Sequence, residues 1–256
     1  LLTYVPASLF FAMRFRHQQN ALAGSLAVTL ANPALLLIDH GHFQYNGVCL
    51  GLVMLAATLV DSASFSAQLM GAIMFVFALN FKHMALYFAP SFFFFLLARS
   101  VSIRHIASSV VRVLLIGVVV VTAFAVLWSP FLRDVPTALQ VVRRLFPVGR
   151  GVFEDKVANF WCSVSPVWKV KSVFQPSQMF AVAAGTTLIA FLPSCLMLVL
   201  RPTFHMFCYN LACVSLSFFL FSFQVRRRGG GGRERGRQFY FSLLFLLFIR
   251  FMKSHF

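Results

Sequence analysis

Residues 110–128 read VVRVLLIGVVVVTAFAVLW, and this stretch decides the fold. A transmembrane helix needs about 20 mostly apolar residues, because its backbone must cross a hydrocarbon layer roughly 30 Å thick. Arg112, near the start, is the one charged residue of the stretch. A helix that is apolar on every side has no polar face that could contact water. The stretch therefore predicts a membrane span.

Seven further apolar stretches surround it, so we expect about eight spans. The chain has 256 residues, of which 60% are hydrophobic and 11% charged. Soluble domains are charged at about one residue in four. The predicted fold class is an all-α, polytopic transmembrane helical bundle, and the other expected spans are Leu1–Met13, Ala21–Ile38, Phe43–Val60, Ser64–Leu79, Met84–Ala98, Met179–Leu200 and Phe204–Val225.

The net charge of +16 does not indicate a nucleic-acid partner. The basic residues punctuate apolar stretches, as expected for loops kept on the cytoplasmic side of a membrane. Counted along the chain, Arg14, Asp61 and Arg99 fall on the cytoplasmic side. The turn 39–46, Asn80–Lys82 and the long loop 129–178 then fall on the lumenal side. We therefore expect the chemistry on the lumenal side, with the lipid bilayer as a partner.

The domain organisation follows from these stretches. Residues 1–225 form one membrane domain that contains the lumenal loop 129–178. Residues 226–238 are a basic Gly/Arg tract of low complexity, and residues 239–256 are an apolar tail whose core is short for a span.

The start of the long loop predicts an interfacial helix. Pro136 suits the first turn of a helix, and Leu139, Val142 and Phe146 then share one face. Arg143 and Arg144 would point towards headgroups or a ligand. An amphipathic helix of this kind lies on a membrane surface.

Residues 37–46, LIDHGHFQYN, form the first polar tract. Polar side chains at membrane depth are costly, so they usually face a cavity or the bundle interior. An ordinary interfacial turn is the alternative. We expect no metal site, because a His pair at i, i+2 does not share a helix face and no third ligand has a recognisable spacing. The candidate residues are Asp39, His40, His42, Gln44, Tyr45 and Asn46.

The second tract contains Asn80 and Lys82 at a lumenal boundary. A lysine there can hold a phosphate as a point charge, or its side chain can simply extend to the membrane surface. Between the two tracts, Gly47 and Gly51 form a GxxxG pattern, which we interpret as close helix packing.

The third tract, residues 143–162, reads RRLFPVGRGVFEDKVANFWC. Arginine forks match phosphate oxygens, and aromatic rings stack on sugar faces, so the tract suits a lipid-phosphate sugar. A loop neutralised by its own salt bridges is the alternative. The candidate residues here are Arg143, Arg144, Arg150, Glu154, Asp155, Lys156, Asn159 and Trp161.

In this order, the three tracts resemble the dolichyl-phosphate-glucose-dependent alpha-1,3-glucosyltransferases, multi-span GT-C enzymes of the lipid-linked oligosaccharide pathway. The similarity runs from about Leu1 to Val225. Residues 153–162, FEDKVANFWC, resemble the enzyme that adds the first glucose. The resemblance implies an endoplasmic-reticulum membrane protein that works in protein N-glycosylation.

The implied reaction moves glucose from dolichyl-phosphate-glucose to the terminal mannose of the dolichol-linked oligosaccharide, with inversion and without a cofactor. The family's base is an Asp in the first lumenal loop, which we expect upstream of Leu1. Asp39, Glu154 and Asp155 are weak substitutes for it, and the other candidates above, with Lys82, would bind substrate. Three alternatives stay open: the paralogue that adds the second glucose, a non-catalytic remnant, and a membrane transporter.

Overall fold

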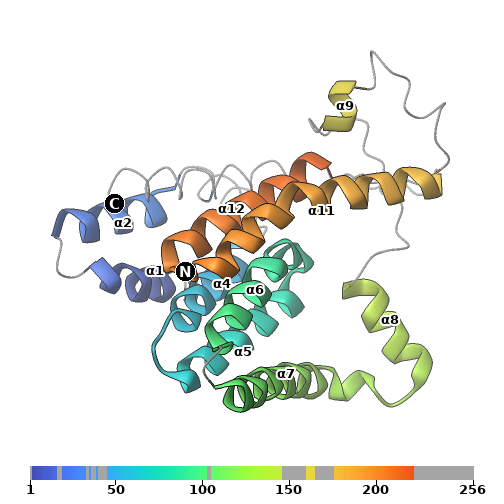
Figure 1. The fold of residues 1–256 in the computed structure, drawn as a ribbon, viewed down its shortest axis with the longest axis horizontal. Coiled ribbons are helices and arrows are strands. Elements are labelled where there is room, and N and C mark those ends of the chain that lie inside the picture. Colours follow the sequence, from blue (N-terminus) through green and yellow to red (C-terminus); the bar gives the residue numbers. More distant parts are fainter. Residues whose placement is uncertain are drawn as a thin grey trace.

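The structure is a computed structural model, and it describes residues 2–15, 19–32, 35, 39, 45–102, 105–145, 160–164 and 176–221. Helices are the regular elements of these residues, and no strand occurs among them. Figure 1 shows the long helices running roughly alongside one another, with the short helices α8 and α9 at one side. The all-α membrane fold predicted from the sequence is confirmed.

Each of the eight expected spans contains a helix. The structure gives α1 (Tyr4–Ala12), α2 (Gln19–Leu30), α4 (Asn46–Val60), α5 (Phe65–Phe81), α6 (Ala89–Ser100), α7 (Ile106–Trp128), α11 (Pro176–Leu200) and α12 (Phe204–Phe221). Among the described residues, three helices have the length and composition to cross a membrane, namely those within 106–131, 181–200 and 204–221. The apolar helices α4 and α5 are shorter.

Helix α4 lies between α1 and α5, and glycines permit both contacts. A Cβ on Gly51 would come within 2.9 Å of the Tyr4 Cα in α1. A Cβ on Gly71 of α5 would lie 2.9 Å from the backbone nitrogen of Val60, at the end of α4. Small residues let helix backbones approach closely where lipid gives no hydrophobic drive for association. The packing interpretation of Gly51 is therefore confirmed.

Phenylalanine rings fill the centre of the bundle. Phe92 of α6 stacks on Phe75 of α5, with ring centroids 4.0 Å apart, and meets Phe207 of α12 edge-on at 5.2 Å. Phe95 stacks on Phe207 at 4.4 Å. Aromatic pairs of this geometry add to the energy of burial. They join the first half of the chain to α12.

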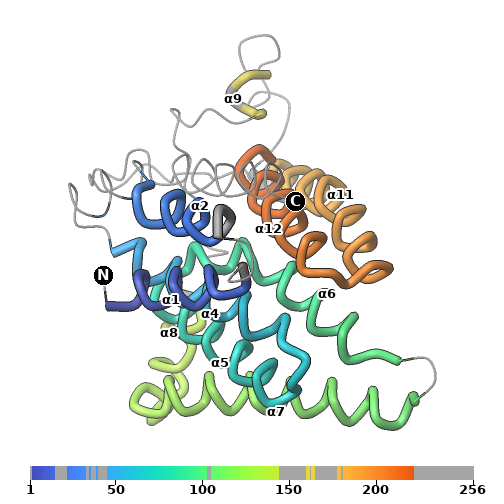
Figure 2. The backbone as a smooth tube through the Cα atoms, turned by 90° about the vertical axis from the view of Figure 1, so that its left-hand side faces the viewer, coloured from blue at the N-terminus to red at the C-terminus, as the bar shows by residue number. Residues whose placement is uncertain are grey.

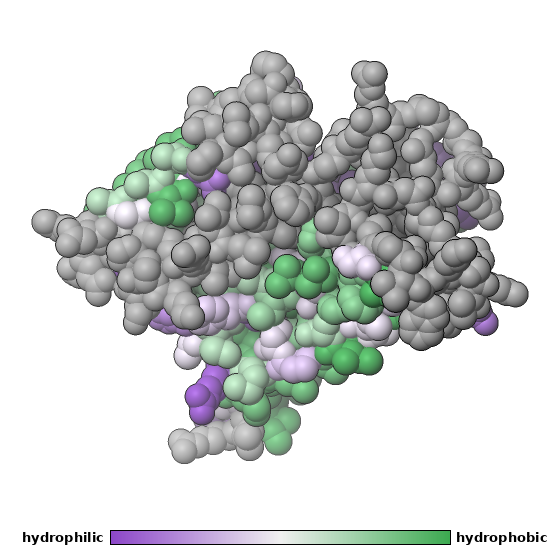
Figure 3. Space-filling model, turned by 90° about the horizontal axis from the view of Figure 1, so that it is seen from above, coloured by the Kyte–Doolittle hydropathy of each residue, from purple (hydrophilic) through white to green (hydrophobic). Residues whose placement is uncertain are grey.

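Helix α7 runs along the edge of the bundle, and both backbone views place it there (Figures 1 and 2). It packs on α5 and, less extensively, on α6. Its most apolar window has a mean hydropathy of 2.8 and is 0% buried inside the protein. A helix satisfies its own backbone polar groups, so lipid can cover such a surface. Apolar patches also occur among the described residues on the face in Figure 3.

Helices α11 and α12 pack side by side as an antiparallel pair, which Figure 2 shows clearly. Asn210 of α12 donates hydrogen bonds to Ser194 Oγ (2.9 Å) and Cys195 Sγ (3.4 Å) of α11. Pro193 lies inside α11 next to these residues. The bonds give the pair a polar contact inside an apolar bundle.

Candidate active site

Asp39 caps the N-terminus of α4, although six residues separate it from the helix. Its Oδ1 accepts a hydrogen bond from the backbone N–H of Asn46 at 2.8 Å, and its Oδ2 accepts one from the N–H of Gly47. The first N–H groups of a helix lack partners within the helix, and the helix dipole favours a negative charge there. Both carboxylate oxygens of Asp39 are thus engaged by the helix that follows the first tract.

The chain enters α4 through a constrained backbone. Tyr45 has φ 55° and ψ 26°, in the left-handed region that non-glycine residues seldom adopt, and its side chain is exposed. A Cβ on Gly47 would lie 2.8 Å from the Asp39 Oδ2. Glycine at 47 therefore leaves room for the capping carboxylate, a role that the GxxxG interpretation missed.

Lys82 joins the second tract to the first. It is the extended residue between α5 and the 3-10 helix η3 (His83–Phe88), and its Nζ donates to the Oδ1 of the buried Asn46. The Asn46 backbone bonds to Asp39 while its side chain bonds to Lys82. The structure therefore brings Asp39, Asn46 and Lys82 into one connected group of opposite charges, bridged by an amide.

A second contact ties this end of α5 to α7. The Nε1 of Trp128, the last residue of α7, donates to the Oδ1 of Asn80 at 2.7 Å. The Nδ2 of Asn80 donates to the Val76 carbonyl at 2.8 Å. Sequence reasoning missed Trp128 as a partner. Its place at the end of a long apolar run was a signal for an interfacial tryptophan, but not for this bond.

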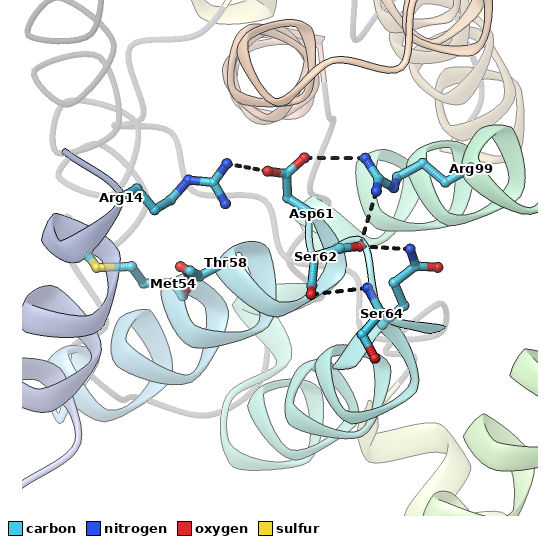
Figure 4. A network of polar contacts seen from close by, with 8 residues as sticks. Arg14, Met54, Thr58, Asp61, Ser62, Ser64 and Arg99 are labelled. Atoms are coloured by element: carbon cyan, nitrogen blue, oxygen red, sulfur yellow. Dashed lines mark hydrogen bonds and ion pairs between the residues drawn. The ribbon is translucent and has the colours of Figure 1, made fainter. Parts of the chain in front are cut away.

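A different set of charges gathers at the other end of α4. Asp61 pairs with Arg14, which follows α1, and with Arg99 near the end of α6 at 3.4 Å (Figure 4). Arg99 also donates to the Ser62 carbonyl at 3.0 Å. The guanidinium of Arg14 lies 4.0 Å from the centroid of the Phe204 ring, at the start of α12.

The residues that meet at the two ends of α4 agree with the alternation of cytoplasmic and lumenal loops expected from the charge pattern. Arg14, Asp61 and Arg99 meet at one end, as residues counted to the cytoplasmic side should. Asn46 and Lys82 meet at the opposite end of α4, as residues counted to the lumenal side should. Ion pairs of this kind lower the cost of placing charge beside a membrane.

The helix expected at the start of the long loop is present as α8 (Val135–Leu145), preceded by the 3-10 helix η4 (Ser129–Phe131). Asp134 caps it through its Oδ2, which accepts from Thr137 Oγ1 at 2.6 Å and Thr137 N at 3.4 Å. Pro136 is its second residue, and Leu139 and Val142 are exposed. Arg143 is in its last turn and exposed, and the backbone of Arg144 follows, while the Arg144 side chain lies outside the described part of the chain.

Trp161 belongs to the short helix α9 (Phe160–Val164) and is buried. Its Nε1 donates to the Phe221 carbonyl at the end of α12 at 2.7 Å, so its indole nitrogen is engaged in a protein contact. The candidates His40, His42, Gln44, Arg150, Glu154, Asp155, Lys156 and Asn159 lie outside the described residues.

Comparisons with known proteins identify the family of this chain. The sequence model of the ALG6, ALG8 glycosyltransferase family matches residues 1–228. A chicken protein named dolichyl pyrophosphate Man9GlcNAc2 alpha-1,3-glucosyltransferase is 39% identical over 229 residues, which cover 89% of this chain and 45% of the relative. The mouse protein of the same name is 41% identical over 230 residues, with the same two coverages.

A fly relative, named as a probable enzyme of the same kind, is 44% identical over 232 residues, covering 89% of this chain and 48% of the relative. The chain thus spans about half the length of the curated relatives it matches. The match includes the Asp39–Asn46–Lys82 group and α8. The chain belongs to the ALG6, ALG8 glycosyltransferase family.

Proposed function

We propose that the protein to which this chain belongs transfers glucose from dolichyl-phosphate-glucose to the dolichol-linked oligosaccharide that serves protein N-glycosylation. The observation that carries the proposal is the identity of about 40% over 89% of the chain to relatives named as Man9GlcNAc2 alpha-1,3-glucosyltransferases. The contact between the first two tracts, through Asn46 and Lys82, supports it from the structure.

The reaction makes one bond and breaks one. A hydroxyl oxygen of the terminal mannose attacks the anomeric carbon of glucose, and the bond from that carbon to the phosphate oxygen breaks. Dolichyl phosphate leaves with the electron pair, and a base takes the hydroxyl proton. Positive groups that face the phosphate stabilise the charge that develops on it. Lys82 and the arginines of α8 are the groups that we assign to this task.

Asp39 is not assigned as the base. Its two oxygens accept the N–H groups that open α4, so removing a proton from substrate would compete with capping the helix. The family resemblance assigns the base to an Asp in a loop that precedes the matched residues. Asp39 instead holds Asn46, and through it Lys82, in place.

We place the active side in the lumen of the endoplasmic reticulum. Arg14, Arg99 and Arg112 gather at the end of the bundle opposite Lys82, and arginines accumulate in loops that stay in the cytoplasm. This orientation leaves Lys82, Trp128 and α8 on the lumenal side, where the oligosaccharide acceptor of the proposed reaction would be.

The first glucosylation step is favoured over the second, since the relatives above are named for the Man9GlcNAc2 acceptor, which bears no glucose. Because the chain belongs to a glycosyltransferase family, we favour an enzyme over the transporter alternative. A non-catalytic remnant is the alternative that needs a direct test.

A chimera provides that test. Residues 1–221 of this chain would replace the matching segment of the mouse relative, and the chimera would be expressed in cells that lack the first-step enzyme. We expect the cells to convert the Man9GlcNAc2 lipid to its monoglucosylated form, as read by mass spectrometry of released glycans. Cells lacking the second-step enzyme serve as the control and should stay uncorrected. A stable chimera without product in either cell line would contradict the proposal.

A further inference from the structure

Helix α8 carries an apolar face that no described residue covers. Val135, Leu139 and Val142 recur at spacings of four and three residues, which places them on one side of a helix. They are 72%, 49% and 39% exposed. Gln140 lies on the opposite side and is also exposed. In Figure 1, α8 stands apart from the long helices, and its most extensive contact within the described chain is with η4.

The neighbouring element fixes where this face can lie. Helix α7 is apolar and 0% buried over its most apolar window, so the side of α7 that faces away from α5 and α6 is a surface that lipid can cover. It ends at Trp128, whose indole N–H is held by Asn80, and tryptophan gathers at the membrane interface. Residues 129–134 then connect α7 to α8, and so short a segment spans at most about 20 Å. Helix α8 must therefore begin close to the membrane surface.

The connection is itself apolar and exposed. Phe131 and Leu132 are 50% and 47% exposed and precede Val135. Phe131 and Leu132 thus provide apolar surface between α7 and α8, beside the polar residues Ser129, Arg133 and Asp134 of the same connection. A capped helix with one apolar face and a basic end is the form that lies in the plane of an interface.

From this continuity we infer that α8 docks on the lipid bilayer, in the leaflet where α7 ends, with Val135, Leu139 and Val142 in the acyl region. Gln140 then faces water. Arg143 lies at the edge of the apolar face, so its guanidinium is held at the level of the lipid phosphates. The docking surface does not depend on the proposed reaction, and its test does not use enzyme activity.

The test uses the full chain in phosphatidylcholine nanodiscs. A dansyl-bearing amino acid would be introduced by amber suppression at position 139 or 142, at position 140 as the matched control, and at position 118 in the middle of α7. Nanodiscs that contain doxyl-labelled lipid quench dansyl fluorescence within the acyl region. Val118 is 60% exposed on a helix that we place in lipid, so it gives the reference for full lipid contact.

We expect positions 139 and 142 to be quenched at least half as strongly as position 118, with blue-shifted emission. The dansyl group at position 140 should be quenched several-fold less than at positions 139 and 142, and its emission should match that of dansyl in water. Equal weak quenching at 139, 140 and 142 would mean that α8 stands off the membrane and would overturn the inference. Blue-shifted emission without quenching at 139 and 142 would overturn it too, because the face would then be covered by protein.

Discussion

The Nζ of Lys82 donates a hydrogen bond to the Oδ1 of Asn46, across 36 positions of sequence. The bond holds a cation beside the N-terminus of α4, whose first N–H groups are occupied by Asp39. Because the Asn46 amide is neutral, this bond itself does not neutralise the ammonium charge of Lys82, whereas a carboxylate at position 46 would. This difference allows the phosphate-binding role of Lys82 to be separated from a structural one.

We expect Asn46→Asp in the chimera to raise the KM for dolichyl-phosphate-glucose while the protein stays folded. The new carboxylate preserves the contact with Lys82 but neutralises its charge. Loss of one charge-assisted contact to the phosphate should weaken donor binding by about 1.5 to 3 kcal/mol, roughly ten-fold or more. Initial rates at varied donor concentration measure the effect.

Asn46→Ala is the matched control, since it removes the contact without adding a charge. A purely structural role for Lys82 makes the opposite prediction. In that case Asn46→Asp keeps or improves stability and leaves donor KM unchanged, while Asn46→Ala is the more harmful variant.

Asp39→Asn should lower stability more than it lowers kcat. An asparagine side chain has one carbonyl oxygen, so it can accept one of the two bonds that Asp39 accepts from α4, and it lacks the charge that suits the helix dipole. Loss of a helix cap costs about 0.5 to 2 kcal/mol. The thermal midpoint and kcat of the purified chimera would be compared. A kcat that falls a thousand-fold at unchanged stability would instead identify Asp39 as the base.

Replacing Arg143, Arg144 or Arg150 by Lys should raise donor KM or lower kcat/KM for the donor. The planar guanidinium gives oriented, paired contacts to phosphate that an ammonium group cannot reproduce. We expect donor KM to rise, or kcat/KM for the donor to fall, about ten-fold for each contact that is lost. Arg133→Lys, at an exposed position before α8, is the control. Unchanged donor kinetics in all three Lys variants would assign these arginines to the loop structure.

Asp61→Asn should destabilise the bundle without changing donor KM. The substitution leaves Arg14 and Arg99 close together with no carboxylate, at side-chain exposures of 29% and 24%. An uncompensated, partly buried charge costs about 1 to 3 kcal/mol. Thermal unfolding of the full chain in nanodiscs measures the loss, and Arg133→Gln, at an exposed charged side chain, is the control. If Arg99→Gln in the same chain does not restore part of the stability, the ion pair is not the cause.

The orientation in the membrane can be tested with engineered glycosylation sites. The sequence contains no N-x-S/T acceptor, so each introduced site is read without background. An acceptor inserted at 149–151 should be glycosylated, and one inserted at 61–64 or 101–105 should not. A gel shift that endoglycosidase reverses reports the modification. The reverse pattern would place Lys82 and α8 in the cytoplasm and would contradict the proposed site of reaction.

Several elements of the fold were predictable because their signals are local. The run 110–128 is apolar on all sides, so composition alone identified α7. Pro136 and the spacing of Leu139 and Val142 identified α8 in the same way. Boundaries were less accurate: the expected span Met84–Ala98 is divided into η3 and α6, with Pro90 at the second position of α6.

The candidate site was predictable in part. The sequence singled out Asp39 and Asn46 as polar residues at membrane depth and Lys82 as a cation at a lumenal boundary, but it could not tell capping from catalysis for Asp39. That distinction rests on which N–H groups lie beside the carboxylate. Trp128 was not predicted as a partner of Asn80, since nothing in either residue's neighbourhood specifies the other.

The sequence by itself determined that this chain is a bundle of membrane helices with charged ends, because hydrophobicity and helix periodicity depend on residues close together in the chain. The tertiary structure alone decided that Asp39 caps α4, that Asn46 holds Lys82, and that Asp61 pairs with both Arg14 and Arg99. The contacts of Lys82 and Asp61 join residues 36 to 47 positions apart in the sequence. They also depend on the packing of α1, α4 and α5, whose backbones approach closely at Gly51 and Gly71.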